Sequence, residues 1–160
     1  MNKILSVNKA IEVTQRLRKL GKTIVLAGGV FDILHLGHIR FLEKSKGKGD
    51  ILLVLLESDQ NAKRRKGQDR PIHTQKNRAS VLSAIPSVDY IILLAEMTKD
   101  NDYDKLINQL KPDIIATTKE DPGKKHKERQ AKLVGGKVEY VLKRIKNQST
   151  TKMEKLIKNK

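Results

Sequence analysis

Apolar residues in this chain gather in short, nearly continuous runs that alternate with stretches of mixed polarity. The runs cover residues 23–27, 51–56, 89–94, 113–116 and 138–142. Runs of this length that are rich in Ile, Val and Leu and bounded by Gly or Pro are typical of strands covered on both faces. The pattern therefore predicts a parallel β-sheet built from these five segments.

Between the predicted strands, apolar residues recur at helical spacing. This spacing predicts helices over residues 7–20, 39–46 and 74–85, around residues 106–110, and over residues 153–157. Gly21 ends the first helix, and Thr74 can cap the third. Strand–helix alternation predicts an α/β fold in which helices cover both faces of an open sheet. We expect a single domain over residues 1–160, with a helical entry at 1–22 and a closing helix at 149–160.

A glycine- and histidine-rich segment follows the first predicted strand. In open α/β sheets, ligands bind beyond the carboxyl ends of the strands, where the strand order reverses. Gly28 and Gly29 let the backbone approach a ligand closely. His35 and His38 stand immediately before a helix, so two imidazoles and free N–H groups can surround one anion. The alternatives are a metal-binding histidine pair or chance surface histidines.

Two further segments carry groups that suit phosphate. Five cations stand in the segment from Lys63 to Arg70, which indicates a solvated loop, a nucleic-acid patch, or a lysine that closes over pyrophosphate. Three hydroxyls, residues 149–151, precede Lys152 and the last helix. A helix cap explains one of them, whereas phosphate binding at a helix start uses all three.

Composition narrows the classes of function. Lys and Arg number 34 against 18 Asp and Glu, a formal net charge of +16, so an anionic partner is expected. Nucleic-acid binding is an alternative, but three Tyr, two Phe and no Trp leave few side chains for base stacking. The absence of Cys excludes disulfides and thiolate chemistry. No apolar run approaches a membrane span, and we expect a cytoplasmic protein with no membrane contact.

The string Gly29-Val30-Phe31-Asp32, followed by His35-Leu36-Gly37-His38, resembles the signature of the cytidylyltransferase-like nucleotidyltransferase superfamily. The resemblance implies a Rossmann-like fold and transfer of a nucleoside monophosphate from an NTP to a phosphate-bearing acceptor, with release of pyrophosphate. The N-terminal entry, Arg70-Pro71-Ile72 and Asn77-Arg78 are similar to a narrower branch, the heptose 1-phosphate adenylyltransferase domains.

The resemblance also implies roles for individual residues. The catalytic residues would be His35, His38 and Lys66. The nucleotide would be bound by Gly29, Val30, Phe31, Asp32, His35, Gly37, His38, Lys63, Arg144, Ser149, Thr150 and Thr151, and the acceptor by Arg70, Arg78 and Lys119. Mg²⁺ would be carried by substrate phosphates rather than by protein ligands, with Asp32 either reaching it or tying down the loop.

The substrates follow from the same resemblance. An arginine common in cytidylyltransferases two positions before Val88-Asp89 is replaced by Pro86, which favours ATP over CTP. Heptose 1-phosphate is the favoured acceptor, although residues 116–123 replace that branch's Lys-Gly-Gly-Asp-Tyr loop. Glycerol phosphate, another polyol phosphate and FMN are the alternative acceptors. The resemblance also suggests a homodimer.

Overall fold

The fold is built around a six-stranded sheet in which every neighbouring pair of strands is parallel. The computed structural model describes residues 2–143, 145 and 149–158. Within them the strand order is β1-β4-β3-β2-β5-β6. The strands are β1 (Ile4–Leu5), β2 (Ile24–Gly29), β3 (Ile51–Leu56), β4 (Tyr90–Leu93), β5 (Ile114–Thr118) and β6 (Lys137–Leu142).

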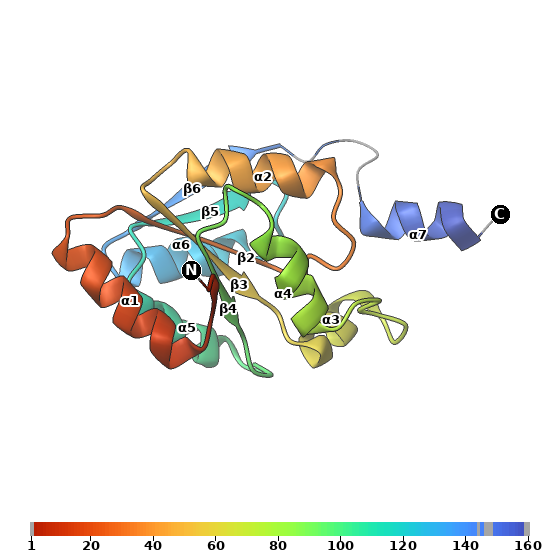
Figure 1. Cartoon of the computed structure of the whole chain (residues 1–160), viewed down its shortest axis with the longest axis horizontal. Coiled ribbons are helices and arrows are strands. Elements are labelled where there is room, and N and C mark those ends of the chain that lie inside the picture. The colour runs from red at the N-terminus through yellow and green to blue at the C-terminus, as the bar shows by residue number, and fades with distance from the viewer. Residues whose placement is uncertain (1, 144, 146–148, 159–160) are drawn as a thin grey trace.

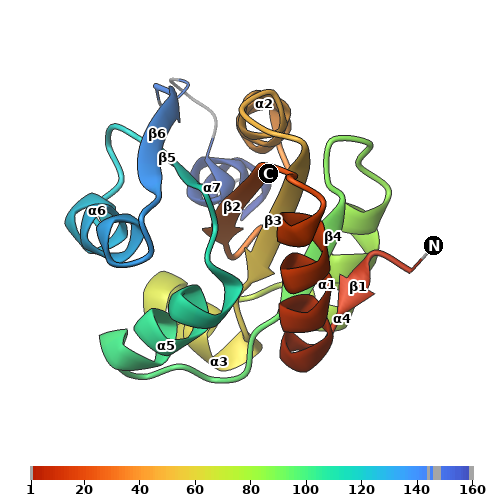
Figure 2. The same ribbon diagram turned by 90° about the vertical axis from the view of Figure 1, so that its left-hand side faces the viewer.

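Helices lie on both faces of this sheet, as the alternating sequence pattern predicts (Figures 1 and 2). They are α1 (Val7–Lys19), α2 (Leu36–Lys46), α3 (Asp59–Lys66), α4 (Gln75–Ser83), α5 (Asp100–Leu110), α6 (Lys124–Leu133) and α7 (Thr150–Lys158). Helices α1, α5 and α6 pack on one face, and α2 and α4 on the other. The predicted open α/β fold is confirmed. No helix among the described residues has the length and apolar character of a membrane span.

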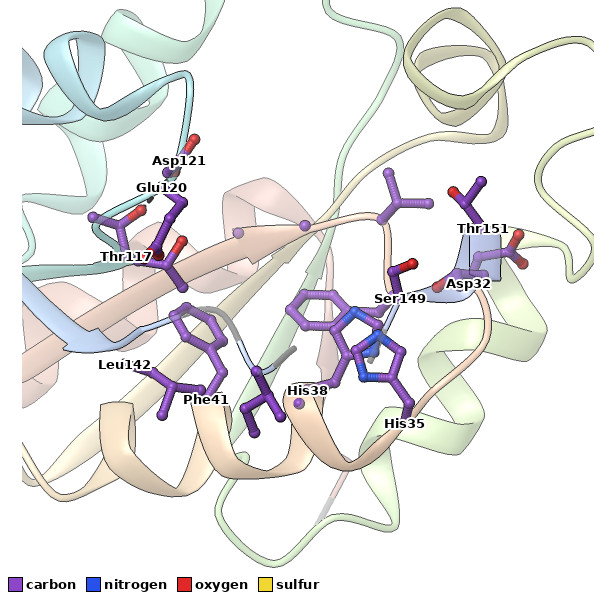
Figure 3. Close-up of a pocket in the computed structure, with 18 of the residues that line it drawn as sticks. Asp32, His35, His38, Phe41, Thr117, Glu120, Asp121, Leu142, Ser149 and Thr151 are labelled. Carbon is purple, nitrogen blue, oxygen red and sulfur yellow. Dashed lines mark hydrogen bonds between the residues drawn. The ribbon is translucent and has the colours of Figure 1, made fainter. Parts of the chain in front are cut away.

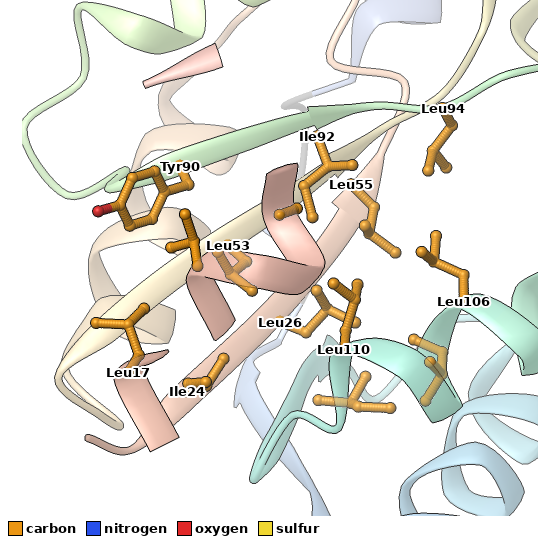
Figure 4. Close-up of a cluster of buried hydrophobic side chains, with 14 of the residues drawn as sticks. Leu17, Ile24, Leu26, Leu53, Leu55, Tyr90, Ile92, Leu94, Leu106 and Leu110 are labelled. Atoms are coloured by element: carbon orange, nitrogen blue, oxygen red, sulfur yellow. The ribbon is translucent and has the colours of Figure 1, made fainter. Parts of the chain in front are cut away.

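The core consists of two apolar layers, one on each side of the sheet. Alternate residues of a strand point to opposite faces, so Leu26 and Leu53 pack beneath α1 and α5 (Figure 4). Their neighbours Val25 and Leu52 pack beneath α2 and α4. Since both layers are apolar, the central strands appear in the sequence as continuous rather than alternating apolar runs.

Three elements differ from the sequence prediction, and one of them, α6, has no counterpart among the predicted helices. The first strand, β1, pairs with β4 through Ile4 and Ile91, but two residues are too short to form a recognisable apolar run. The cationic segment after β3 is also partly helical rather than a loop, because α3 occupies residues 59–66. The Ser58 hydroxyl caps that helix by accepting from the Asn61 N–H at 3.1 Å.

The strand order reverses at β2. From β2 the chain proceeds outward to β3 and β4, and then returns to β5 on the other side of β2. Connections that leave in opposite directions open a crevice at the carboxyl ends of the two central strands. The segment from Gly28 to His38 begins at that crevice, so the topology positions the predicted ligand site.

Arg78 is part of the core beneath this crevice. Its side chain has no exposed surface, and its guanidinium donates to the carbonyl oxygens of Val30, His73 and Glu57, in the last two cases at 3.0 and 2.9 Å. It also pairs with Asp59 at 2.7 Å. The predicted role of Arg78 as an acceptor contact does not fit this structure, because its donors bind protein oxygens. Arg78 instead joins three segments that frame the site.

Replacing Arg78 with Met should therefore lower the stability of the fold. Three buried carbonyl groups would lose a charged donor, and the free energy of unfolding should fall by about 3 kcal/mol. Urea unfolding of Arg78→Met measures this, with Lys76→Met as the control, because Lys76 is exposed on the same helix. Equal stability of the two variants would show that Arg78 has no structural role.

Candidate active site

The loop after β2 is held by the carboxylate of Asp32. This carboxylate accepts from Arg70 Nε at 2.7 Å and from the backbone N–H groups of Ile72 and His73 at 2.9 and 3.0 Å. The side chains of Asp32 and Arg70 are 2% and 5% exposed. We call this set of contacts the Asp32 anchor. It joins the loop after β2 to the segment that precedes α4.

The same anchor extends to the closing helix. Arg70 NH1 contacts Glu154 Oε2 on α7 at 3.0 Å, and the Thr150 hydroxyl donates to the Ile33 carbonyl oxygen at 3.3 Å. The start of α7 is thereby placed against the loop after β2, although the two segments lie more than 110 positions apart in the chain. Sequence patterns do not show this pairing of Arg70 with Glu154.

These contacts also set the charge state of Asp32. Burial raises its pKa, but the N–H groups of His73 and Ile72 and the Arg70 guanidinium outweigh burial and hold the pKa below its ordinary value. Asp32 is thus an ionised carboxylate whose oxygens are engaged by the protein. Of the two roles considered for Asp32, the structure supports anchoring the loop rather than reaching a metal ion.

The rings of His35 and His38 stack on each other at the start of α2. Their centroids are 3.9 Å apart and their planes differ by 25°. Phe31 packs edge-on against His38, with centroids 5.3 Å apart. Phe31 has a φ of 47°, and a Cβ on Gly29 would lie 2.9 Å from its ring. Gly29 is therefore required by the packing that positions the histidine pair.

His38 is buried beside other nitrogen groups. Burial, the neighbouring His35 ring and the Lys66 ammonium lower its pKa to about 4, so the imidazole is neutral at pH 7. The Nδ1 atom of His38 is buried without a hydrogen-bond partner among the described residues. A buried polar atom of this kind normally has a partner, and a bound anion or its hydration shell would supply one here.

A cavity of about 460 Å³ opens in front of the histidine pair. Figure 3 shows His35 and His38 near Ser149 and Thr151 on one side of it, and Thr117, Glu120 and Asp121 on the other. Many of the predicted nucleotide-binding residues line this cavity: Gly29, Val30, Phe31, Asp32, His35, Gly37, His38, Ser149, Thr150 and Thr151, together with Lys66 and Arg70.

The closing helix contributes its N-terminus to this cavity. The Ser149 hydroxyl accepts from the Lys152 N–H at 3.1 Å, which is the geometry of a helix cap. Its own O–H remains available as a donor toward the cavity. The capping explanation and the phosphate-binding explanation of this hydroxyl are therefore compatible.

Three of the predicted residues that the structure describes, Lys63, Arg78 and Lys119, are not part of this cavity. Lys63 and Lys119 are exposed and absent from its lining. Lys63 lies on the solvent-facing part of α3, three residues before Lys66, and Lys119 lies just after β5. The predicted Arg144 lies outside the described residues. The structure thus favours Lys66 over Lys63 as the lysine nearest the histidines.

Sequence reasoning missed a polar cluster on the opposite wall. Lys127 on α6 donates to Asp121 and, at 3.2 Å, to Thr117 at the end of β5. Burial raises the pKa of Asp121, but hydrogen bonds from Lys127 and Thr117 outweigh it and lower the pKa. Lys127 belongs to a basic segment, residues 124–127, and the helical geometry of α6 turns it toward the cavity.

The lowered pKa of His38 makes a prediction about stability. The unfolded chain binds a proton at this imidazole near pH 6.5, whereas the folded chain binds it only near pH 4. Stability should therefore fall as the pH drops below 6.5, by about 2 kcal/mol between pH 7.5 and pH 5. Urea unfolding at both pH values measures this loss in the wild type.

Two variants isolate the contribution of His38. His38→Gln should lose about 2 kcal/mol less than the wild type over the same pH interval. His73→Gln, at an exposed histidine, should retain the pH dependence of the wild type. An identical loss in the wild type and His38→Gln would contradict a neutral, buried His38.

Comparisons with known proteins agree with the fold and the loop. The model of the cytidylyltransferase-like family matches residues 26–155. The chain is 45% identical over 112 residues to the bifunctional protein HldE of Nitratiruptor sp., and 42% identical over 123 residues to that of Campylobacter fetus. These matches cover 70% and 77% of this chain but only 23% and 25% of the relatives.

Two solved structures share the architecture. A lipopolysaccharide core biosynthesis protein from Thermoplasma volcanium is 32% identical, with a TM-score of 0.65 over 78% of this chain and 100% of that one. A pantoate–β-alanine ligase from Francisella tularensis is 17% identical, with a TM-score of 0.67 over 99% of this chain and 77% of that one. The second likeness concerns the fold alone.

The family match includes the loop after β2, the histidine pair, Lys66 and the start of α7. It confirms the superfamily that the sequence motif predicted and supports the predicted class of enzyme, a nucleotidyltransferase. The chain belongs to the cytidylyltransferase-like family.

Proposed function

We propose that this domain transfers a nucleoside monophosphate, AMP by preference, from an NTP to a sugar phosphate such as heptose 1-phosphate, with release of pyrophosphate. The observation that carries the proposal is the convergence of distant groups on one cavity. The stacked imidazoles, the Lys66 ammonium and the hydroxyls that begin α7 all line it. Each of these groups can donate to phosphate oxygens.

The reaction needs no nucleophile from the protein. An oxygen of the acceptor phosphate is already ionised at neutral pH and attacks the α-phosphorus of the NTP. A new P–O bond forms as the bond to the β-phosphate oxygen breaks, and pyrophosphate leaves in line with the attack. The protein then contributes position and electrostatic stabilisation.

The two histidines contribute most where charge accumulates. A neutral imidazole can donate one N–H to a non-bridging phosphate oxygen, and the geometry fixed by Phe31 and α2 orients both rings before the substrate arrives. Once a triphosphate replaces water beside His38, its negative charge raises the affinity of the ring for a proton. Hydrogen bonds from the imidazoles would therefore strengthen as charge moves to the leaving group.

Lys66 and the start of α7 act on the rest of the triphosphate. Lys66 lies at the C-terminal end of α3. The next residue, Gly67, has a φ of 111°, a backbone conformation that glycine adopts readily and other residues rarely do. A long side chain at such a position can follow the pyrophosphate as it leaves. The hydroxyls of Ser149 and Thr151 add donors at a helix N-terminus, where the helix dipole favours anions.

Mg²⁺ would enter this site bound to the substrate phosphates. Among the described residues, no group of three or more His, Cys, Asp or Glu side chains is arranged to hold a metal, and the Asp32 oxygens are engaged by Arg70 and backbone N–H groups. When bound to the phosphates, the ion neutralises their charge and keeps most of its ligands as phosphate oxygens and water.

The relatives support the choice of acceptor. The similar structure from Thermoplasma volcanium is that of a lipopolysaccharide core biosynthesis protein, which favours a sugar phosphate as the acceptor. Pro86 stands where an arginine accompanies CTP use, which favours ATP. The chain spans about a quarter of the length of its HldE relatives. Three expectations stay predictions: the single-domain organisation, the cytoplasmic location and the homodimer.

Removing either imidazole should slow the transfer without unfolding the domain. His35→Ala and His38→Ala should each lower kcat by about 10²- to 10³-fold, because each variant removes a donor to the charge that develops on the phosphates. Pyrophosphate release from ATP with heptose 1-phosphate measures the rate, and circular dichroism verifies the fold. His73→Ala, an exposed histidine outside the cavity, is the matched control. Turnover at the wild-type rate in both site variants would refute the assigned roles.

A further inference from the structure

We infer that Arg64 is a positioning residue for the nucleotide, because its guanidinium holds α3 in the orientation that directs Lys66 into the histidine-lined cavity. This inference rests on the proposed function, in which Lys66 acts on the triphosphate. Helix α3 ends with four cations in a row, Lys63–Lys66. Of these four, Lys66 is the one that lines the cavity, so the contacts of its neighbours need a different explanation.

Apolar packing does little to fix the position of α3. The helix has eight residues, and its one apolar side chain is the fully buried methyl group of Ala62. Burial of a single methyl group contributes little free energy, and a helix of this length is not stable in water by itself. The orientation of α3 must therefore be set by its polar side chains.

The Arg64 guanidinium joins α3 to the segment between β4 and α5. One of its terminal nitrogens pairs with the Glu96 carboxylate. The other donates to the side-chain oxygen of Asn61 and, at 3.2 Å, to the carbonyl oxygen of Met97. A planar guanidinium can satisfy several acceptors at once only in a narrow range of orientations. These contacts therefore restrict the rotation of α3 about its axis.

The buried amide of Asn61 is the second part of this arrangement. Asn61 is 2% exposed, and its Nδ2 group donates to the Glu57 carboxylate at 2.8 Å and to the Tyr103 hydroxyl at 3.0 Å. Its oxygen accepts from Arg64. The amide thus has partners for its nitrogen and its oxygen, and Arg65 pairs with the same Glu57 at 3.1 Å. Arg64 and Arg65 are therefore engaged by protein groups rather than left for a ligand.

These contacts determine where Lys66 points. Successive residues of an α-helix project about 100° apart. Arg64 reaches the segment after β4, Arg65 reaches the end of β3, and Lys66 reaches the cavity. The Lys66 ammonium lies close enough to His38 to lower the pKa of that imidazole. A rotation of α3 that broke the Arg64 contacts would also turn Lys66 away from the histidines.

Arg64 and Glu96 act from outside the site. Neither lines the histidine-lined cavity or the neighbouring cavity beside Glu57 and Tyr103. Their side chains are 46% and 48% exposed, and an exposed ion pair contributes little to the stability of a whole domain. Replacing either residue should therefore leave the fold intact and loosen α3, which lowers the fraction of molecules in which Lys66 faces the phosphates.

A double-mutant cycle with Lys66 tests this inference. Arg64→Lys keeps the positive charge but loses the planar fork that reaches several partners. Glu96→Gln removes a negative charge, so charge alone predicts tighter anion binding, whereas loss of positioning predicts weaker binding. Each substitution is made with Lys66 present and together with Lys66→Ala. The controls are Arg40→Lys and Glu43→Gln, from an exposed pair on α2 outside both cavities.

Calorimetry measures the affinity of each variant for a non-hydrolysable ATP analogue with Mg²⁺, and circular dichroism verifies the fold. Lys66→Ala should weaken binding about tenfold or more, because it removes a charged donor to phosphate. We expect Arg64→Lys and Glu96→Gln to weaken binding about three- to tenfold when Lys66 is present, and less than about twofold when it is replaced. The two control variants should match the wild type.

Several results would overturn the inference. Equal losses with and without Lys66 would show that Arg64 and Glu96 act by another route. Affinity at or above the wild-type value in Arg64→Lys or in Glu96→Gln would show that they do not position Lys66. Wild-type affinity in Lys66→Ala would show that there is no contact of Lys66 with the nucleotide to be positioned.

Pyrophosphate release from ATP with a sugar phosphate separates this inference from the proposed function. A wild type that binds the analogue with the expected coupling, but releases no pyrophosphate, would support the role of Arg64 and overturn the proposed transfer. Turnover in the wild type without coupling in the cycle would overturn the inference and leave the transfer intact. A wild type that neither binds the analogue nor releases pyrophosphate would overturn both.

Discussion

The structure of the site depends on one buried ion pair, between Asp32 and Arg70. Both side chains are almost fully enclosed, and removal of one partner from such a pair costs about 3–5 kcal/mol, because the other charge is left without compensation. The pair connects the loop after β2 to the segment before α4 and, through Glu154, to α7. Three stretches of the predicted site are thereby held in one arrangement.

This arrangement explains how a strongly cationic chain can have a site that is not simply a patch of charge. The two imidazoles are packed together and against Phe31, and burial keeps His38 neutral. The nearby cations, Lys66 on α3 and Lys127 on α6, both line the cavity. A neutral imidazole therefore lies where the phosphates would dock, with ammonium groups in the lining of the same cavity.

The sequence was sufficient to predict the central strands and the histidine loop, and the reasons are physical. Strands covered on both faces must be apolar throughout, so β2 and β3 appear as continuous runs. The loop requires Gly29 because the Phe31 ring occupies the space of a side chain, and it requires its two histidines in fixed register with α2. Because these constraints act between residues that are close in the chain, they can be recognised in the sequence.

Other features depend on contacts between distant segments and could not be found in the same way. The strand β1 exists only because β4 offers it an edge. Arg78 is as polar as the exposed arginines, and its burial is apparent only when the carbonyls of Val30 and Glu57 are seen around it. Lys127, Arg65 and Tyr103 come from three separate helices, so contacts among these segments leave no local pattern in the sequence.

The central claim is that the Asp32 anchor presents two packed imidazoles, of which His38 is neutral, to the phosphates of a nucleotide. NMR titration of the His38 imidazole, with and without a non-hydrolysable ATP analogue and Mg²⁺, tests it most directly. The account predicts a pKa of about 4 in the free protein and a clear rise in pKa, with shifted ring resonances, when the analogue is bound. Ring resonances that stay unchanged at saturating nucleotide would contradict it.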